Sequence, residues 1–149
     1  MVEKIKKERP IIALFVDGPN MLRKEFMVDL RELKKRVAKY GRLTIARVFL
    51  NQFAPEKLIE AVINEGFEPV MVLAQQEEES NDVDVSLAVS AIDVVISKDA
   101  DIIALATRDA DFLPVIQKAK EYGKKVIILG ADPGFSASLR NAADYVEML

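Results

Sequence analysis

The chain has 149 residues, of which 50% are hydrophobic and 30% charged, and this composition predicts one globular domain. It contains no cysteine and no histidine, which excludes disulfides, thiolate nucleophiles, Cys/His zinc sites and every reaction that needs an imidazole base. No apolar run reaches the length of about 18 residues that spans a bilayer. The first ten residues are charged and lack the apolar core of a signal peptide, so we expect a cytoplasmic protein.

The net charge of −3 conceals an asymmetry between two parts of the chain. Residues 1–47 carry 13 Lys and Arg against 6 Asp and Glu, whereas residues 48–149 carry 8 against 18. A basic part beside an acidic part suits a protein that holds a polyanion near a metal-binding acidic cluster. Charges unevenly distributed over exposed helix faces would give the same counts.

Apolar runs alternate with helix-like segments along the first half of the chain, after a charged segment at residues 1–10. The predicted elements are a strand at 11–16, a turn at 17–20, a helix at 21–40, a strand at 43–50, a helix at 55–65, a strand at 68–73 and a helix at 82–97. Gly41 and Gly66 stop the first two helices.

The same alternation continues to the end of the chain. The remaining predicted elements are a strand at 101–107, a helix at 111–122, a strand at 125–130, a short helix at 136–141 and a last apolar piece at 143–149. Strands that are apolar throughout and alternate with helices indicate a parallel sheet covered on both faces. Residues 11–149 are therefore predicted to form a single α/β domain, a three-layer α/β/α sandwich with a mainly parallel central sheet.

Several aspartates are predicted at one edge of this sheet. Asp17 follows the first strand, Asp109 and Asp111 follow the fourth, and Asp84 lies in the first turn of the helix before the fourth strand. Ligands of open parallel sheets bind at the carboxyl ends of the strands, where the winding reverses. Converging carboxylates repel one another, and a hard divalent cation such as Mg²⁺ or Mn²⁺ resolves that conflict. The pattern predicts metal-dependent attack of water on a phosphodiester.

Each of these residues also has a purely structural interpretation. Asp17 is a common turn residue, and Asp111 is a good N-cap with Pro114 tolerated in the first helical turn. Asp84 favours the helix dipole without any ligand, and Asp82 is predicted to cap that helix. Because these interpretations leave Asp109 unexplained, the three aspartates at strand ends, Asp17, Asp109 and Asp111, together favour a metal site.

Four motifs, in order, resemble those of the NYN (LabA-like) domain family, which belongs to the PIN-like superfamily of nucleases. They are "FVDGPNM", "NDVDVSLAVSAID", "ATRDADFLPVIQKAKEYGKKVIILG" and "SASLRNAADYVEML", and they extend over residues 11–149. The resemblance implies a PIN-like sandwich with Mg²⁺- or Mn²⁺-dependent ribonuclease activity. The residues that match the family's site are Asp17, Asn20, Asp84, Thr107, Asp109 and Asp111.

The resemblance also implies a role for each of these side chains. The four aspartates ligate the metal, Asn20 orients a ligand or water, and Thr107 supports the carboxylates by hydrogen bonding. Ser136 in the late turn contacts phosphate or braces Asp17.

The chain departs from many relatives at three places. Asn81-Asp82 replaces a lysine, Ser90 replaces a second acid on the helix, and Arg108 replaces a small residue. Because Ser90 lacks a carboxylate, the resemblance leaves open whether the site holds a second metal ion and whether it has full activity. Arg108 is expected either to pair with phosphate as a bidentate donor or to neutralise the carboxylates.

The expected partner is RNA, and a symmetric dimer that extends the RNA groove is a further expectation. Basic residues near the first turn and along the following helix are candidates to hold the RNA backbone, and they include Arg23, Lys24, Arg31, Lys35, Lys39 and Arg42. A solvated amphipathic helix explains them equally well. The alternative function is a non-catalytic RNA-binding or regulatory module on the same fold. Phosphatases and phospho-receiver domains fit less well, because the first strand ends in a single acid.

Overall fold

The computed structural model describes residues 9–22, 29–76, 81–132 and 134–149. Within these residues, six strands form one sheet in the order β3-β2-β1-β4-β5-β6, and every neighbouring pair is parallel. The strands are β1 (Ile11–Asp17), β2 (Arg42–Asn51), β3 (Glu68–Val72), β4 (Ile102–Ala106), β5 (Lys125–Gly130) and β6 (Tyr145–Met148). The predicted α/β class and parallel sheet are confirmed.

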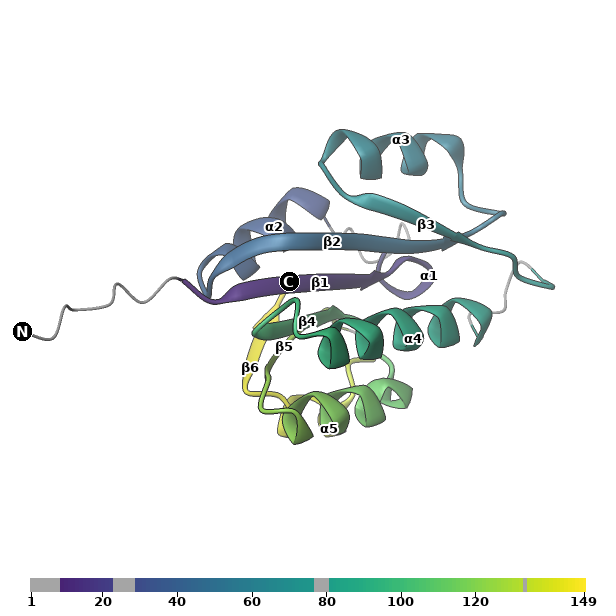
Figure 1. Cartoon of the computed structure of the whole chain (residues 1–149). Helices are drawn as coiled ribbons and strands as arrows, with labels where there is room; N and C mark the ends of the chain where they lie inside the picture. The colour runs from purple at the N-terminus through teal and green to yellow at the C-terminus, as the bar shows by residue number, and fades with distance from the viewer. Residues whose placement is uncertain (1–8, 23–28, 77–80, 133) are drawn as a thin grey trace, which may run out of the picture.

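Helices cover both faces of the sheet, which gives three layers (Figure 1). The helical elements are α1 (Gly18–Met21), α2 (Leu30–Ala38), α3 (Glu56–Asn64), α4 (Asn81–Ser97), the 3₁₀ turn η2 (Ala110–Phe112), α5 (Leu113–Glu121) and α6 (Ala137–Ala142). Buried side chains of α1, α2 and α3 pack on one face, and those of α4, α5 and α6 pack on the other. Within the described residues, no helix combines the length and apolar character needed to cross a bilayer.

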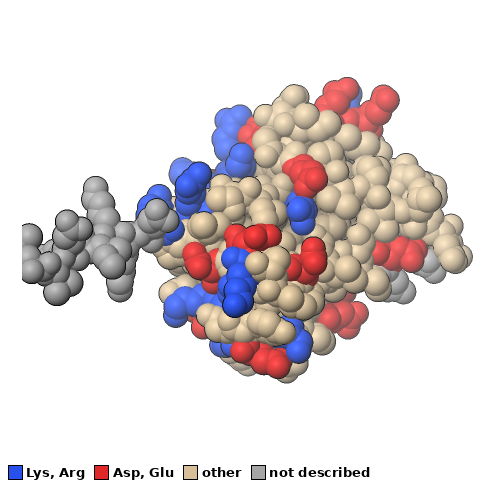
Figure 2. All heavy atoms as spheres, viewed as in Figure 1, with Lys and Arg blue, Asp and Glu red and all other residues tan. Residues whose placement is uncertain are grey.

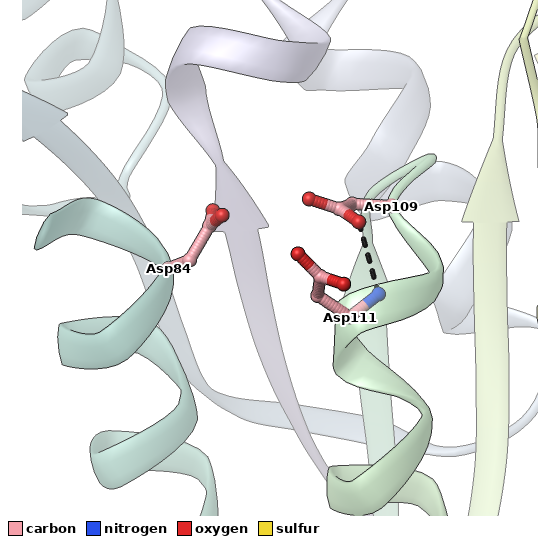
Figure 3. A group of neighbouring side chains, drawn as sticks. All are labelled: Asp84, Asp109 and Asp111. Atoms are coloured by element: carbon pink, nitrogen blue, oxygen red, sulfur yellow. Dashed lines mark hydrogen bonds between the residues drawn. The ribbon is translucent and has the colours of Figure 1, made fainter. Parts of the chain in front are cut away.

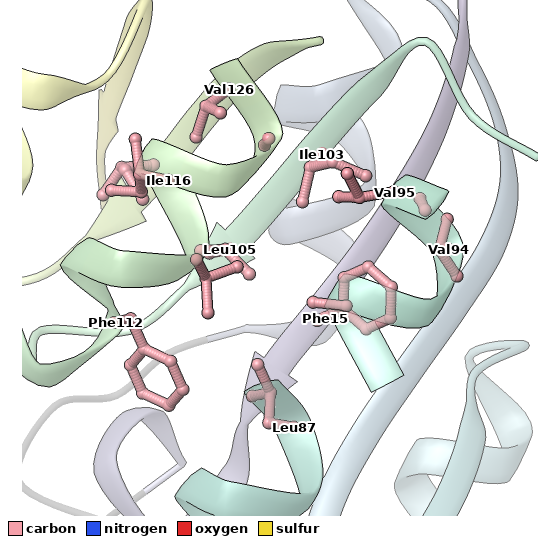
Figure 4. Close-up of a cluster of buried hydrophobic side chains, with 14 of the residues drawn as sticks. Phe15, Leu87, Val94, Val95, Ile103, Leu105, Phe112, Ile116 and Val126 are labelled. Carbon is pink, nitrogen blue, oxygen red and sulfur yellow. The ribbon is translucent and has the colours of Figure 1, made fainter. Parts of the chain in front are cut away.

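The central strand β1 shows why its sequence is apolar throughout. Ala13 and Phe15 point into the cluster under α4 and α5, whereas Leu14 and Val16 point into the cluster under α2. All four are completely buried, because successive side chains of a strand lie on opposite faces and both faces are covered. Figure 4 shows Phe15 packed with Leu87 of α4 near Leu105 of β4.

The topology brings β4 beside β1. From β1 the chain moves outward to β2 and β3, then returns through α4 to β4 on the other side of β1. The register pairs Val16 of β1 with Ala106 of β4. The carboxyl ends of these two strands therefore form the point where the winding reverses, which is where open α/β sheets bind their ligands.

Four predicted elements differ from the structure. The predicted turn at 17–20 is the last residue of β1 followed by the short helix α1. The predicted helix at 21–40 is not continuous: α1 ends at Met21, and α2 begins at Leu30 after Asp29, whose side chain accepts a hydrogen bond from the Arg31 backbone N–H at 2.8 Å. The Asp29 cap starts a new helix, and residues 23–28 lie outside the described residues. The predicted helix at 111–122 begins as a 3₁₀ turn and becomes α-helical at Leu113. The last apolar piece contains the sixth strand.

Candidate metal centre at the ends of β1 and β4

The site begins with two residues at the end of the paired central strands. Asp17 is the last residue of β1, and Thr107 directly follows β4. Both are buried, and the Thr107 hydroxyl donates a hydrogen bond to Asp17 Oδ2 at 3.4 Å. Their position follows from strand pairing, because the register places Val16 opposite Ala106 one residue earlier.

Thr107 also orders the turn that carries the next two carboxylates. Its Oγ1 accepts a hydrogen bond from the Asp109 backbone N–H at 3.2 Å, and Asp109 Oδ1 accepts one from the Asp111 N–H at 2.9 Å. Asp109 is therefore the N-cap of η2, so the predicted capping role of Asp111 is wrong. Pro114 does lie in the first turn of α5, as predicted.

Asp84 reaches this turn from the first turn of α4 (Figure 3). One carboxylate oxygen from each of Asp84, Asp109 and Asp111 can be chosen so that all three lie within 4.8 Å of one another. We call these three residues the aspartate cluster. Asp17 does not belong to this group of three and lies fully buried beside Asp84. Asp82 lies inside α4, which begins at Asn81, so its predicted capping role is wrong.

Burial and the nearby aspartates disfavour the charged form of Asp84. Burial, followed by the charges of Asp17 and Asp109, a hydrogen bond with Asp17 and the charge of Asp111, raises the pKa of Asp84 to about 7. Its Oδ1 atom is buried and has no hydrogen-bond partner among the described residues. An oxygen of this kind lacks the donors that normally satisfy a buried carboxylate. A divalent cation would supply the missing positive charge, so the residues present fit a hard metal ion.

Two cavities adjoin the aspartate cluster. One, of about 400 Å³, is lined by Arg108, Asp109, Ala110, Gly134 and Ser136. The other, of about 260 Å³, is lined by Asp84, Val85, Ala88, Asp111 and Phe112. Sequence reasoning selected Arg108 and Ser136 but missed Gly134, whose positive φ of 91° is visible only in the structure.

A larger cavity of about 860 Å³ contains none of the three aspartates. Its polar wall includes Arg47, which donates to Ser90 Oγ at 2.9 Å and pairs with Glu68 at 2.8 Å. Ser90 thus joins α4 to β2 through Arg47, and it takes no part in the aspartate cluster. Because most of the other residues lining this cavity are apolar, we place the chemistry at the smaller cavities beside the carboxylates.

Several other residues that the sequence predicts to contact RNA or a ligand lie outside the described residues or are paired with acidic side chains. The Asn20 side chain, Arg23 and Lys24 lie outside the described residues. On α2, Arg31 pairs with Glu65 at 3.1 Å, and Lys39 pairs with Glu147 at 2.7 Å.

The basic residues that are predicted to hold the RNA backbone lead away from the aspartates. Arg42 pairs with Ile11 at the start of β1, whereas Asp17 is the last residue of that strand. In Figure 2, Lys and Arg gather mainly on the left of the view, the side on which β1 begins in Figure 1. The described members of this set, which run along α2 to Arg42, therefore extend toward the opposite end of the sheet from the aspartate cluster.

Comparisons with known proteins agree with this architecture. The model of the NYN domain matches residues 11–149. The uncharacterized protein MJ0482 of Methanocaldococcus jannaschii is 56% identical over 135 residues, which cover 91% of this chain and 53% of that protein. The chain thus spans about half the length of that relative. The crystal structure of VPA0982 from Vibrio parahaemolyticus, a protein of unknown function, matches with a TM-score of 0.82 and 19% identity over 97% of this chain and 96% of the other. This last likeness shows the fold.

Proposed function

The chain belongs to the NYN domain family, a PIN-like nuclease family, and from this membership and its aspartate cluster we propose a metal-dependent ribonuclease. The reaction is hydrolysis of RNA phosphodiester bonds with Mg²⁺ or Mn²⁺. The observation that carries the proposal is the approach of three carboxylate oxygens to within 4.8 Å at the point where the sheet reverses its winding.

The donor set selects the class of metal. All three donors are carboxylate oxygens, and the chain has no cysteine or histidine to attract softer metals. Mg²⁺ and Mn²⁺ prefer oxygen ligands, and Mg²⁺ usually keeps several waters and binds through few protein carboxylates together with substrate phosphate. Asp84, Asp109 and Asp111 would hold the ion. When bound, it would supply an activated water and stabilise negative charge on the phosphate.

The protein's own residues position this chemistry. Thr107 accepts from the Asp109 N–H, and Asp109 accepts from the Asp111 N–H, so one short turn presents two carboxylates in fixed orientation. Asp17 lies fully buried and accepts a hydrogen bond from the Thr107 hydroxyl. This hydrogen bond connects the turn to the end of β1. Such supporting hydrogen bonds commonly hold metal ligands in place.

RNA as the substrate rests on the family and on the uneven charge of the chain. The test is incubation of purified protein with a mixed set of labelled RNAs in Mg²⁺, Mn²⁺ or EDTA. Asp84→Asn and Asp109→Asn remove one carboxylate charge each. Asp93→Asn is the matched control, because Asp93 is an exposed aspartate on the same helix as Asp84.

The proposal expects metal-dependent cleavage by the wild type and by Asp93→Asn, with loss of cleavage in both cluster variants. Wild type that binds RNA in a gel shift without cutting any RNA in the set would favour the non-catalytic RNA-binding module. Cleavage that survives both cluster substitutions would place the reaction elsewhere or in a contaminant.

A further inference from the structure

We propose that the cavity formed by Arg108, Gly134 and Ser136 binds a phosphate group of the RNA strand, next to the phosphodiester at the aspartate cluster. The proposal rests on RNA as the ligand of the proposed function and adds a binding site to it. Arg108 would donate to the phosphate oxygens, and the Ser136 hydroxyl would donate beside it.

The cavity lies directly beside the aspartate cluster. Asp109 belongs both to its wall and to the aspartate cluster, so a group bound in the cavity lies beside the reacting phosphate. The second cavity is lined by Asp84 and Asp111, and no Lys or Arg is among the described residues that line it. A strand that crosses the aspartates thus meets a cation in the Arg108 cavity. Cationic side chains supply most of the affinity for a nucleic acid backbone.

Neighbouring backbone holds the Arg108 guanidinium in place at this cavity. Arg108 lies between Thr107 and Asp109, whose hydrogen bond of 3.2 Å holds the backbone on both sides of it. A Cβ atom at Gly134 would lie 3.1 Å from Arg108 Nη1, so the guanidinium rests against the Gly134 backbone. Gly134 has a φ of +91°, a conformation that favours glycine. The missing side chain leaves room for this close approach.

The hydrogen-bond donors at the cavity suit a phosphate group. A guanidinium presents a planar fork of N–H groups that matches two phosphate oxygens, and such bidentate pairs are stronger than neutral hydrogen bonds. Ser136 directly precedes α6, but its side chain makes no capping hydrogen bond there. Its hydroxyl is therefore not committed to the helix and can donate to an anion. Phosphate is the anionic group of RNA, so the cavity fits the backbone and not a base.

The test is RNA binding without metal, so that cleavage does not enter the readout. A short single-stranded RNA with a 3′ fluorophore is titrated with the whole protein in EDTA, and anisotropy gives the dissociation constant over a range of KCl concentrations. The variants are Arg108→Gln and Arg108→Lys. Lys125→Gln is the control, because Lys125 is an exposed lysine at the first residue of β5, at the end of the sheet opposite to Asp17. Thermal melting confirms that each variant is folded.

Arg108→Gln is expected to weaken binding about tenfold and to reduce the slope of log affinity against log salt by about 0.7, which corresponds to one lost phosphate contact on a single strand. Arg108→Lys should keep the slope and recover part of the affinity, because it keeps the charge but loses the fork. RNAs with a 5′ phosphate and a 5′ hydroxyl distinguish the source of the phosphate. A penalty confined to the first identifies the strand end, and a penalty in both identifies an internal phosphodiester.

An Arg108→Gln variant with the affinity and salt slope of Lys125→Gln would overturn the phosphate site, as would a wild type that binds no RNA. If the wild type cuts RNA in Mn²⁺ but shows no Arg108-dependent slope, the phosphate site fails and the ribonuclease stands. If the wild type binds RNA with the expected salt slope but cuts no RNA, the proposed ribonuclease activity is wrong and the proposed phosphate site is supported.

Discussion

The Thr107 hydroxyl donates a hydrogen bond to Asp17 Oδ2 across the paired ends of β4 and β1, and Thr107 Oγ1 accepts one from the Asp109 N–H. One side chain thus couples a fully buried carboxylate to the turn that carries Asp109 and Asp111. Geometry of this kind makes Thr107 a positioning residue whose role is measurable apart from any reaction.

Thr107→Val should weaken the binding of Mn²⁺ by about tenfold or more, because supporting hydrogen bonds of metal ligands typically contribute 10- to 100-fold in affinity. Valine has a similar volume but no hydroxyl, so Asp17 and the Asp109 N–H both lose a partner. Isothermal titration with Mn²⁺ measures the change. Thr107→Ser keeps the hydroxyl and is the control. Equal affinities for the Val and Ser variants would contradict the positioning role.

Asp84 should make metal-free protein less stable as the pH rises. Burial first, then neighbouring aspartate charges, raises its pKa from 3.8 to about 7. Folding therefore favours the protonated acid, and that stabilisation is fully present below about pH 4 and is lost as the pH rises through about 7. In EDTA, the difference in Tm between Asp84→Asn and the wild type should grow in favour of the variant between pH 5 and pH 8. A constant difference would contradict the raised pKa.

Metal binding should show the opposite dependence on pH. A cation must displace the Asp84 proton, so its affinity rises as the pH increases through about 7. The rise in wild-type Tm on adding Mn²⁺ should be larger at pH 8 than at pH 6. Asp93→Asn, which leaves the aspartate cluster intact, should show the same rise as the wild type. A metal effect on Tm that is independent of pH would argue against Asp84 as a ligand.

Glu147 should matter to stability although it lies outside the candidate site. It is 8% exposed in β6 and accepts from Lys39 at 2.7 Å and from the Tyr40 hydroxyl at 2.6 Å, which connects the last strand to the end of α2. Burial alone would raise the pKa of Glu147, but these hydrogen bonds outweigh it and hold the pKa below its usual range. The hydrogen bond with Glu147 is also the largest cause that raises the pKa of Tyr40 to about 12.

Glu147→Gln should lower the free energy of unfolding by about 2 kcal/mol, within the range for hydrogen bonds to charged groups. Urea denaturation at neutral pH measures it. Glu121→Gln is the control, because its pair with Lys118 is exposed and such pairs contribute little. Because the pKa of Glu147 is lowered, its contribution should disappear as the pH falls below the ordinary range of a glutamate. An equal decrease in the free energy of unfolding in the two variants would show that the hydrogen bonds of Glu147 contribute no more than an exposed ion pair.

Gly18→Ala should disturb the metal centre through the backbone. Gly18 directly follows Asp17, and a Cβ atom there would collide with the Phe49 carbonyl oxygen and approach Leu50 Cδ2 to 2.6 Å. The backbone must shift, at a cost of about 1–3 kcal/mol for an overpacked site. We expect a lower free energy of unfolding together with weaker Mn²⁺ binding, measured by urea denaturation and titration calorimetry. An unchanged free energy of unfolding together with an unchanged Mn²⁺ affinity would mean that the end of β2 shifts to accommodate the methyl group without moving Asp17.

Local sequence patterns predicted most of the helices and strands, but they did not predict where N-cap residues start α2 and η2. The run from 21 to 40 has helical composition, yet Asp29 caps a new helix at Leu30. Asp111 has the position of an N-cap by sequence, but Asp109 caps the turn because Thr107 fixes the Asp109 backbone. Similarly, the family resemblance suggests that Ser90 stands in the place of an acid of the site, but the structure places it against Arg47 of β2.

The sequence by itself determined the α/β class, the exclusion of imidazole and thiol chemistry, and the choice of aspartates at strand ends, because periodicity, composition and order along the chain are local properties. Only the tertiary structure decided that β4 lies beside β1, that Asp84 approaches Asp109 and Asp111 while Asp17 lies buried beside them, and that Arg108 rests against Gly134. These relationships depend on the crossover through α4 and on side-chain packing between segments far apart in the chain. No local pattern encodes distances of that kind.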